Sequence, residues 1–122
     1  MPCSYVIDRK RQVILTTFSG QVTGAEIKAM QDRLQSDADF STELNSLIDA
    51  SEATELMMDI NEMRLITSRS QLAGSARRAF VANATIVVAV GRMLDSYRQI
   101  AGGKEQSRIF PDRAAAQEWL GL

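Results

Sequence analysis

The sequence contains no histidine among its 122 residues. Histidine is the commonest general base, the usual partner of a catalytic serine or cysteine, and the commonest zinc ligand. Its absence excludes Ser-His and Cys-His nucleophile pairs and removes the usual ligand of a zinc site. The chain has one cysteine, Cys3, so it forms no internal disulfide, and a secreted disulfide scaffold is excluded.

Long apolar segments and a strong net charge are also missing. No apolar run approaches the ~20 residues that span a bilayer, and the first twelve residues lack an apolar signal core. The formal charge of −1 provides no bulk attraction for nucleic acid or anionic lipid. With 45% apolar and 24% charged residues, the composition is typical of a globular domain. We therefore expect a cytoplasmic protein of one domain, residues 1–122, with no membrane span and no nucleic-acid partner.

Strand and helix patterns alternate along the chain. Strand patterns occupy residues 4–8, 12–19, 44–50, 78–82 and 107–110. Helix patterns occupy residues 23–36, the segment from 59 or 60 to Gly74, residues 84–101, and the segment from Pro111-Asp112 onward. The order β-β-α-β-α-β-α-β-α predicts a single α/β domain. Its sheet is five-stranded, mixed and mostly parallel, with right-handed crossovers after an antiparallel hairpin.

Capping residues predict where the helices begin and end. Thr23 and Glu26 have the spacing of a capping box, and so do Asp59 and Glu62. Asn83 is placed as the N-cap of the helix at 84–101, and Gly102-Gly103 as its C-cap. Gly20 is expected to end the second strand, and a loop is expected to join the strand at 44–50 to the helix near 59.

In the helix that follows Asp59, the apolar spacing predicts which side chains point inward. Ile60 and Met63 belong to the inward row, together with either Ile66 or Thr67. Leu65 and Leu72 widen this row.

Residues 84–101 are compatible with two structures. Residues 85–90, TIVVAV, have strand composition, whereas the longer window has helical phase. Its apolar residues recur in steps of four and three, at Ile86, Val90, Met93, Tyr97 and Ile100. We predict a helix with this row packed inward. Val87 and Val88 then exceed the needs of one core face, so they are either extra core or a self-association surface.

The acids and hydroxyls of the chain give little support for catalysis. Four acids lie close together in the sequence: Asp49, Glu52, Glu55 and Asp59. A strand end and a helix cap explain two of them, so a magnesium site is poorly supported. The segment Gly102-Gly103-Lys104 follows a helix, whereas a phosphate loop opens one. Ser51 and Thr54 have no histidine base. We predict no metal, no cofactor and no catalytic residue.

The best site hypothesis is a rim where strands end. Asp49 and Ser51 follow the third predicted strand, and Asn83 and Thr85 follow the fourth, so they share one edge if those strands are neighbours. Two methionines before the second capping box have no assigned core face, and they form either a plastic core edge or an adaptable surface. The predicted partner- or ligand-binding rim comprises Asp49, Ser51, Glu52, Met57, Met58, Asp59, Asn61, Asn83 and Thr85.

Seven segments, in this order and spacing, resemble a known family. They are YVID at 5–8, VTGAEI at 22–27, DADF at 37–40, LIDAS at 47–51, RRAFVA at 77–82, GRM at 91–93 and IFPDRAAAQEWL at 109–120. Together they resemble the SpoIIAA-like proteins, relatives of the STAS domains found in anti-sigma-factor antagonists and anion-transporter tails. The resemblance implies a mixed sheet flanked by helices, and a binding or regulatory module rather than an enzyme.

One departure from those regulators concerns their phosphorylation site. Anti-sigma-factor antagonists carry an Asp-Ser-Ser/Thr-Gly motif where a loop enters the helix after the third strand, and a kinase phosphorylates its serine. Here Asp59 matches the aspartate, but Ile60 and Asn61 follow it. The resemblance therefore implies that the phosphoswitch does not operate at this position.

Three functions are compatible with the sequence. The leading hypothesis is a non-enzymatic STAS-like module that binds a protein partner or a second copy of itself through residues 50–63. The alternative is a carrier of a small apolar or lipid-like ligand, because related folds include lipid-transfer domains and Val87 and Val88 exceed the expected core. The third is an enzyme that uses the acids at 49, 52 and 59, which requires an acid with a strongly shifted pKa in a cleft.

Overall fold

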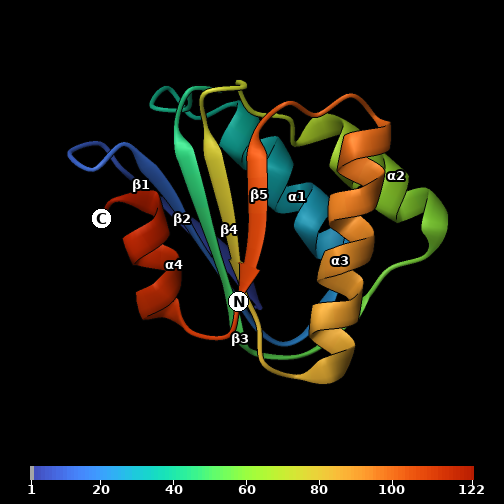
Figure 1. Cartoon of the computed structure of the whole chain (residues 1–122). Helices are drawn as coiled ribbons and strands as arrows, with labels where there is room; N and C mark the ends of the chain where they lie inside the picture. Colours follow the sequence, from blue (N-terminus) through green and yellow to red (C-terminus); the bar gives the residue numbers. More distant parts are fainter. Residues whose placement is uncertain (1) are drawn as a thin grey trace.

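The computed structural model describes residues 2–122, which form five strands and four helices (Figure 1). The strands are β1 (Cys3–Asp8), β2 (Val13–Thr23), β3 (Asn45–Met57), β4 (Arg77–Val81) and β5 (Gln106–Phe110). The helices are α1 (Gly24–Gln35), α2 (Ile60–Arg69), α3 (Thr85–Ile100) and α4 (Arg113–Leu120). The predicted order of elements is confirmed. Within residues 2–122, every helix is too short or too polar to cross a bilayer.

The strands form one sheet in the order β1-β2-β3-β4-β5. β1 and β2 pair antiparallel through the opening hairpin, and each later pair is parallel. The predicted mixed, mostly parallel sheet is therefore confirmed. Its strand order follows the chain order, because each crossover helix returns the chain to the adjacent position in the sheet.

The two faces of the sheet are covered unequally. Helices α1, α2 and α3 lie on one face and α4 lies alone on the other (Figure 1). Successive side chains of a strand point to opposite faces, so they enter two separate cores. Phe18 and Phe80 pack on the three-helix side, whereas Leu47 and Val81 pack under α4.

Both predicted capping boxes are present. Thr23 Oγ1 accepts from the Glu26 amide at 3.2 Å, and Glu26 Oε1 accepts from the Thr23 amide at 3.0 Å. The Asp59 carboxylate accepts from the Glu62 amide at 2.7 Å, and the Glu62 carboxylate accepts from the Asp59 amide at 3.0 Å. Each box satisfies two amides that a helix start leaves unpaired, and such a cap contributes about 1 kcal/mol.

The start of α3 differs from the prediction. Its N-cap is Ala84, which has no side chain that can accept a hydrogen bond, and Asn83 lies one residue outside the helix. With its amide nitrogen turned inward, Asn83 donates to the carbonyls of Ala82 and Pro111. Asn83 therefore ties the end of β4 to the start of the α4 segment. At the other end, Gly102 has a φ of +91°, as the predicted glycine C-cap requires.

Strand β3 is longer than the sequence pattern predicted. Residues 51–57, expected to be a loop, continue the strand and pair with the second half of β2. Gly20, expected to end β2, has a φ of +62° and lies where the register between the two strands shifts. A glycine in this conformation produces a bulge and lets pairing continue beyond it. Ala53 and Leu56 then reach the core on the three-helix side.

The predicted inward face of α3 is largely wrong, although Val90 of the predicted row packs partly buried against the core. The buried residues of the helix are Val87, Gly91, Leu94 and Arg98, which also recur in steps of four and three. Ile86 is 55% exposed and Ile100 is 80% exposed, whereas Val87 is fully buried in the core. Val87 is therefore not a surplus apolar residue and is not available for self-association, and Val88 is partly buried against the same core.

The predicted face of α2 is partly wrong as well. Met63, Ile66 and Thr67 are buried, as predicted. Ile60 and Leu65, which were expected to point inward, are exposed. Ile60 is the first residue of the helix and follows the cap directly, so it projects into solvent beyond the edge of the sheet.

We expect Val87→Ala to lower the free energy of unfolding by about 2 kcal/mol, because it removes two buried methyl groups and leaves a cavity. Ile86→Ala on the neighbouring exposed position should change it by less than ~0.5 kcal/mol. Urea unfolding monitored by circular dichroism measures both. A larger loss for Ile86→Ala than for Val87→Ala would contradict the observed phase of α3.

Candidate functional site

The predicted rim is divided into two groups. β3 and β4 are neighbours, with Asp49 opposite Val81, as the rim hypothesis requires. However, β3 continues eight residues beyond Asp49, roughly 25 Å of strand. Asp49 and Ser51 therefore lie on the middle of the strand beside the ends of β4 and β5. The residues from Met57 to Asn61 lie at its far end.

Asp49 is engaged in structural contacts. Its Oδ1 accepts from the Ser51 hydroxyl at 2.6 Å and from the Ser51 amide at 3.0 Å, and its Oδ2 accepts from Arg113 Nη1 at 3.1 Å. Burial raises the pKa of Asp49, but the Ser51 bonds and the Arg113 guanidinium outweigh it and hold the pKa below its ordinary value. A carboxylate of lowered pKa is a poor general base, so the Ser51–Asp49 pair lacks the chemistry of an activated nucleophile.

The remaining rim residues lie in three places. Glu52 is exposed in the middle of β3, and Asn83 and Thr85 are exposed after β4. At the far end of β3, Asp59 caps α2 and Asn61 is exposed. Met58 packs against the core, and its Cγ lies close to Gly24, where a side chain on α1 would collide with it. Met57 is 46% exposed. Of the two methionines, Met58 is therefore a core-edge residue, and Met57 remains a surface candidate.

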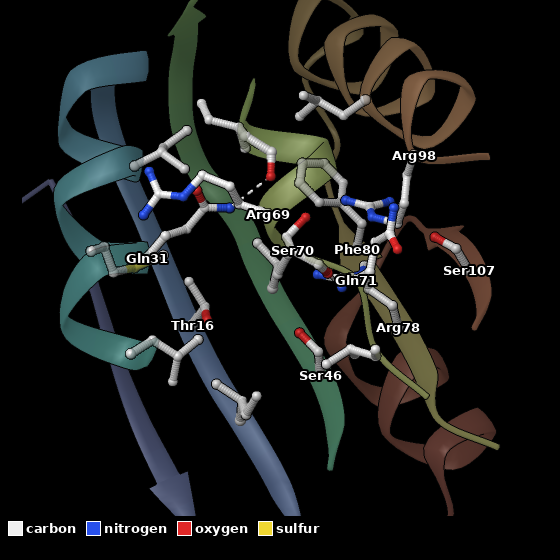
Figure 2. Close-up of a pocket in the computed structure, with 18 of the residues that line it drawn as sticks. Thr16, Gln31, Ser46, Arg69, Ser70, Gln71, Arg78, Phe80, Arg98 and Ser107 are labelled. Carbon is white, nitrogen blue, oxygen red and sulfur yellow. Dashed lines mark hydrogen bonds between the residues drawn. The ribbon is translucent and has the colours of Figure 1, made fainter. Parts of the chain in front are cut away.

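The structure contains a cavity that the sequence did not predict. It has a volume of about 100 Å³ and lies between the sheet and helices α1, α2 and α3 (Figure 2). Its apolar walls come from strands β2 to β5 and from the three helices. They include Ile14, Phe18, Ile27, Met30, Leu34, Ile48, Ile66, Phe80, Leu94 and Ile109.

Polar side chains also line this cavity, and several of them have buried atoms without a hydrogen-bond partner. These atoms are Gln31 Oε1, Ser70 Oγ, Arg78 Nε, Asp95 Oδ1 and Arg98 Nε. More than nine in ten buried polar groups in folded proteins are paired, and an unpaired one costs about 1–3 kcal/mol. Their concentration around one cavity therefore distinguishes it from an ordinary packing defect.

Two arginines line the polar end of the cavity and share one buried glutamate. Arg78 Nη2 and Arg98 Nε both lie 3.4 Å from Glu105 Oε1, and the Glu105 side chain is fully buried. Arg78 Nη2 also donates to the Ser70 carbonyl. Burial and the neighbouring Arg98 lower the pKa of Arg78 to about 9, so the guanidinium remains protonated at neutral pH. Burial likewise lowers the pKa of Arg98. We refer to Arg78, Arg98 and Glu105 as the buried arginine–glutamate cluster.

The cavity opens toward the ends of α1 and α2. Of its lining residues, Gln35 is exposed, and Phe40 and Gln71 are half-buried. Hydrogen bonds across this opening hold the two helices together. Gln31 Nε2 donates to the Ile66 carbonyl at 2.9 Å, and Gln35 Nε2 donates to the Arg69 carbonyl at 3.0 Å. Of these two glutamines, Gln31 is buried and Gln35 is exposed, so only the outer hydrogen bond faces solvent.

Comparison with known proteins gives one clear result. No protein-family model matches the sequence, and no curated protein matches it. Among solved structures, the chain is similar to an uncharacterized DUF3478 family protein from Shewanella loihica PV-4, whose 2.25 Å crystal structure has a SpoIIAA-like fold. The TM-score is 0.62 at 17% sequence identity, over 97% of this chain and 93% of that chain. This chain has a SpoIIAA-like fold. The predicted resemblance is confirmed at the level of the fold.

Within this SpoIIAA-like fold, the cavity and the predicted rim lie toward opposite ends of the parallel strands. The rim was placed at the carboxyl ends, where ligands of open α/β sheets usually bind. The cavity lies toward the amino ends, under Arg78 and Arg98. One feature of the sequence points to the cavity: Arg98 continues, at helical spacing, the buried row of α3 formed by Val87, Gly91 and Leu94. Among residues 2–122, no three His, Cys, Asp or Glu side chains gather as metal ligands.

We expect Asp49→Asn to lower the free energy of unfolding at pH 7 by about 1 kcal/mol or less, since the ion pair is partly solvent-exposed. The carboxylate has a lowered pKa in the folded state, so its stabilisation is present above the ordinary value of 3.8 and is lost as the pH falls below it. The difference between variant and parent should therefore shrink between pH 5 and pH 2.5 in urea unfolding. Glu52→Gln on the exposed neighbour is the control and should be neutral. A pH-independent difference would contradict this assignment.

Proposed function

We propose that this protein is a non-enzymatic carrier that binds a small, largely apolar ligand in the cavity between the sheet and helices α1 to α3. The observation that carries this proposal is a partly open cavity with apolar walls and several unpartnered buried polar atoms. Ligand sites in proteins have this character: mostly apolar walls, with a few polar groups that fix the orientation of the ligand. Among the carboxylates of the predicted rim, Asp59 caps a helix, Asp49 forms an ion pair and Glu52 faces solvent. These roles support catalysis less than the cavity supports ligand binding.

The size of the cavity limits the ligand. A cavity of about 150 Å³ holds benzene, and drug-sized ligands occupy roughly 300–1,000 Å³. The cavity here, at about 100 Å³, is smaller but partly open, so it suits a short branched chain, or a single ring whose edge extends into the opening. A whole lipid is too large, so of the two ligand classes expected from the sequence the small apolar one is favoured. A ligand of about eight non-hydrogen atoms gains roughly 4–6 kcal/mol, which corresponds to dissociation constants from about 1 mM to tens of micromolar.

The test fills the cavity with a side chain. Thr16 is buried and lines the cavity (Figure 2). Thr17 is adjacent on β2, but its side chain is exposed on the opposite face of the strand. Thr16→Leu should abolish binding of toluene and benzamide, and it should preserve or raise the melting temperature because it adds buried apolar surface. Thr17→Leu should leave binding unchanged. Ligand-detected NMR at millimolar probe concentration measures binding.

Two outcomes would contradict the carrier function. Absence of binding by the parent protein for both probes would remove the basis of the proposal. Equal binding by the Thr16→Leu and Thr17→Leu variants would show that the probes bind outside the cavity. Native mass spectrometry of the protein incubated with each probe at millimolar concentration offers an independent measurement of occupancy, because a ligand with such a dissociation constant is lost during purification.

A second function, association with a protein partner or a second copy, is supported by a different observation. On α3, the exposed Ile86, Met93 and Ile100 are spaced by seven residues, so they share one face of the helix. Met57, Ile60 and Leu65 add exposed apolar side chains at the end of β3 and on the adjacent α2. Contiguous exposed apolar residues often mark association surfaces, and regular helical spacing suits a partner helix. The surface consists of Met57, Ile60, Leu65, Ile86, Met93 and Ile100.

We expect the double variant Ile86→Ser with Met93→Ser to weaken any self-association at least tenfold while leaving the fold intact, because neither residue is in the core. Val6→Ser is the matched control: Val6 is also exposed, but it lies on β1 at the opposite edge of the sheet. Sedimentation velocity across a concentration series gives the dissociation constant. Monomeric behaviour of the parent at several hundred micromolar, together with the same pull-down partners for both variants, would contradict this function.

A further inference from the structure

Three hydrogen-bond donors at the polar end of the cavity make no well-formed hydrogen bond. They are Arg78 Nε, Ser70 Oγ and Arg98 Nε, the last of which lies 3.4 Å from Glu105 Oε1 but outside hydrogen-bond geometry. Arg78 Nη2 donates to the carbonyl of Ser70, which places the Ser70 side chain near the guanidinium group. Figure 2 shows the side chains of Arg78 and Arg98 beside each other next to Phe80, with Gln31 on α1 across the cavity. Polar and apolar lining groups are therefore adjacent at this end.

The charges of the buried arginine–glutamate cluster are not balanced within the cluster itself. Two buried guanidinium groups face one fully buried carboxylate. Both contacts measure 3.4 Å, whereas a well-formed charge-assisted hydrogen bond measures about 2.7–2.9 Å. Asp95 supplies a second carboxylate, whose buried Oδ1 lies 3.6 Å from Arg98 Nη1, so the formal charges of the two arginines and the two acids balance. All of these contacts are long, and the guanidinium N–H groups at the polar end are therefore incompletely paired.

We propose that the ligand of this cavity is a small organic acid, a ring or short branched chain with one carboxylate, whose oxygens accept hydrogen bonds from Arg78 and Arg98. The inference rests on the proposed carrier function and names its ligand class. A carboxylate supplies acceptors in the planar arrangement that guanidinium groups recognise. The apolar remainder of such an acid fills the space against Phe80 and Leu94. A neutral amide offers one acceptor oxygen where a carboxylate offers two, a hydrocarbon offers none, and inorganic phosphate leaves the apolar part of the cavity empty.

The test compares benzoate with benzamide, two probes of nearly equal shape that differ in charge at pH 7. Benzoate should bind at least about tenfold more tightly, since hydrogen bonds to charged groups contribute more than those between neutral groups. Inorganic phosphate at 10 mM should not displace it. Isothermal titration calorimetry and ligand-detected NMR at low salt give the affinities. Equal affinity for the two aromatic probes would overturn the acid inference and leave the carrier function standing. If neither aromatic probe binds, both the acid inference and the carrier function are overturned. If phosphate displaces benzoate with equal affinity, the site binds a simple anion and the acid inference is overturned.

Two variants on α3 act in opposite directions. Arg98→Met removes one guanidinium and leaves Arg78 paired with Glu105, so the buried charges balance and the fold should survive. It should weaken benzoate binding about tenfold and change benzamide binding less than about threefold. Asp95→Asn removes the carboxylate that competes for Arg98, and it should strengthen benzoate binding a few-fold with no effect on benzamide. Unchanged benzoate affinity in Arg98→Met would overturn the inference. If that variant does not fold, weaker or unchanged benzoate binding in Asp95→Asn would overturn it instead.

Discussion

The buried arginine–glutamate cluster is the interaction on which the amino-terminal end of the sheet depends. Glu105 precedes β5, Arg78 lies at the start of β4, and Arg98 lies in the last turn of α3, so one carboxylate joins three segments distant in sequence. Glu105 also accepts from the Leu72 amide at 3.3 Å, which brings in the segment after α2. Removal of one member of such a buried cluster leaves an uncompensated charge in the interior, and the loss reaches several kcal/mol when the remaining charge has no other partner. The position of these segments is therefore determined by charge as well as by apolar packing.

The rotation of α3 about its axis follows from the same cluster. Arg98 must point inward to reach Glu105, and residues four, seven and eleven positions earlier then point inward too. Those positions hold Leu94, Gly91 and Val87. Gly91 permits the close approach of the helix to Phe80, since a Cβ at this position would lie 2.8 Å from Phe80 Cε1. The same rotation directs Ile86, Met93 and Ile100 outward, so the exposed apolar row is a consequence of the buried charges.

The fold was largely predictable because its signals are local. Strand composition, the capping boxes at Thr23 and Asp59, and short connections gave the order of elements and the mixed sheet, and the structure confirms them. The face of α3 was not predictable from apolar periodicity, because two rows with equal spacing compete and the true one contains a glycine and an arginine. The length of β3 was missed because its second half is stabilised by pairing with β2 across a bulge, which is a long-range interaction. The cavity was missed for the same reason, since it exists only where three helices and four strands meet.

The unpartnered polar atoms explain why the cavity argues for binding more strongly than its volume does. Larger side chains could fill a cavity of this size. Buried ion pairs can often be replaced by apolar residues without loss of stability. The sequence instead keeps two guanidinium groups whose Nε atoms form no well-aligned hydrogen bond, beside apolar walls. Departures from good local packing and pairing concentrate at functional sites in natural proteins. A ligand that completes these hydrogen bonds binds the folded chain only, so it stabilises the fold by mass action in proportion to the donors it satisfies. Binding and stability are then coupled through the same cluster that orients α3.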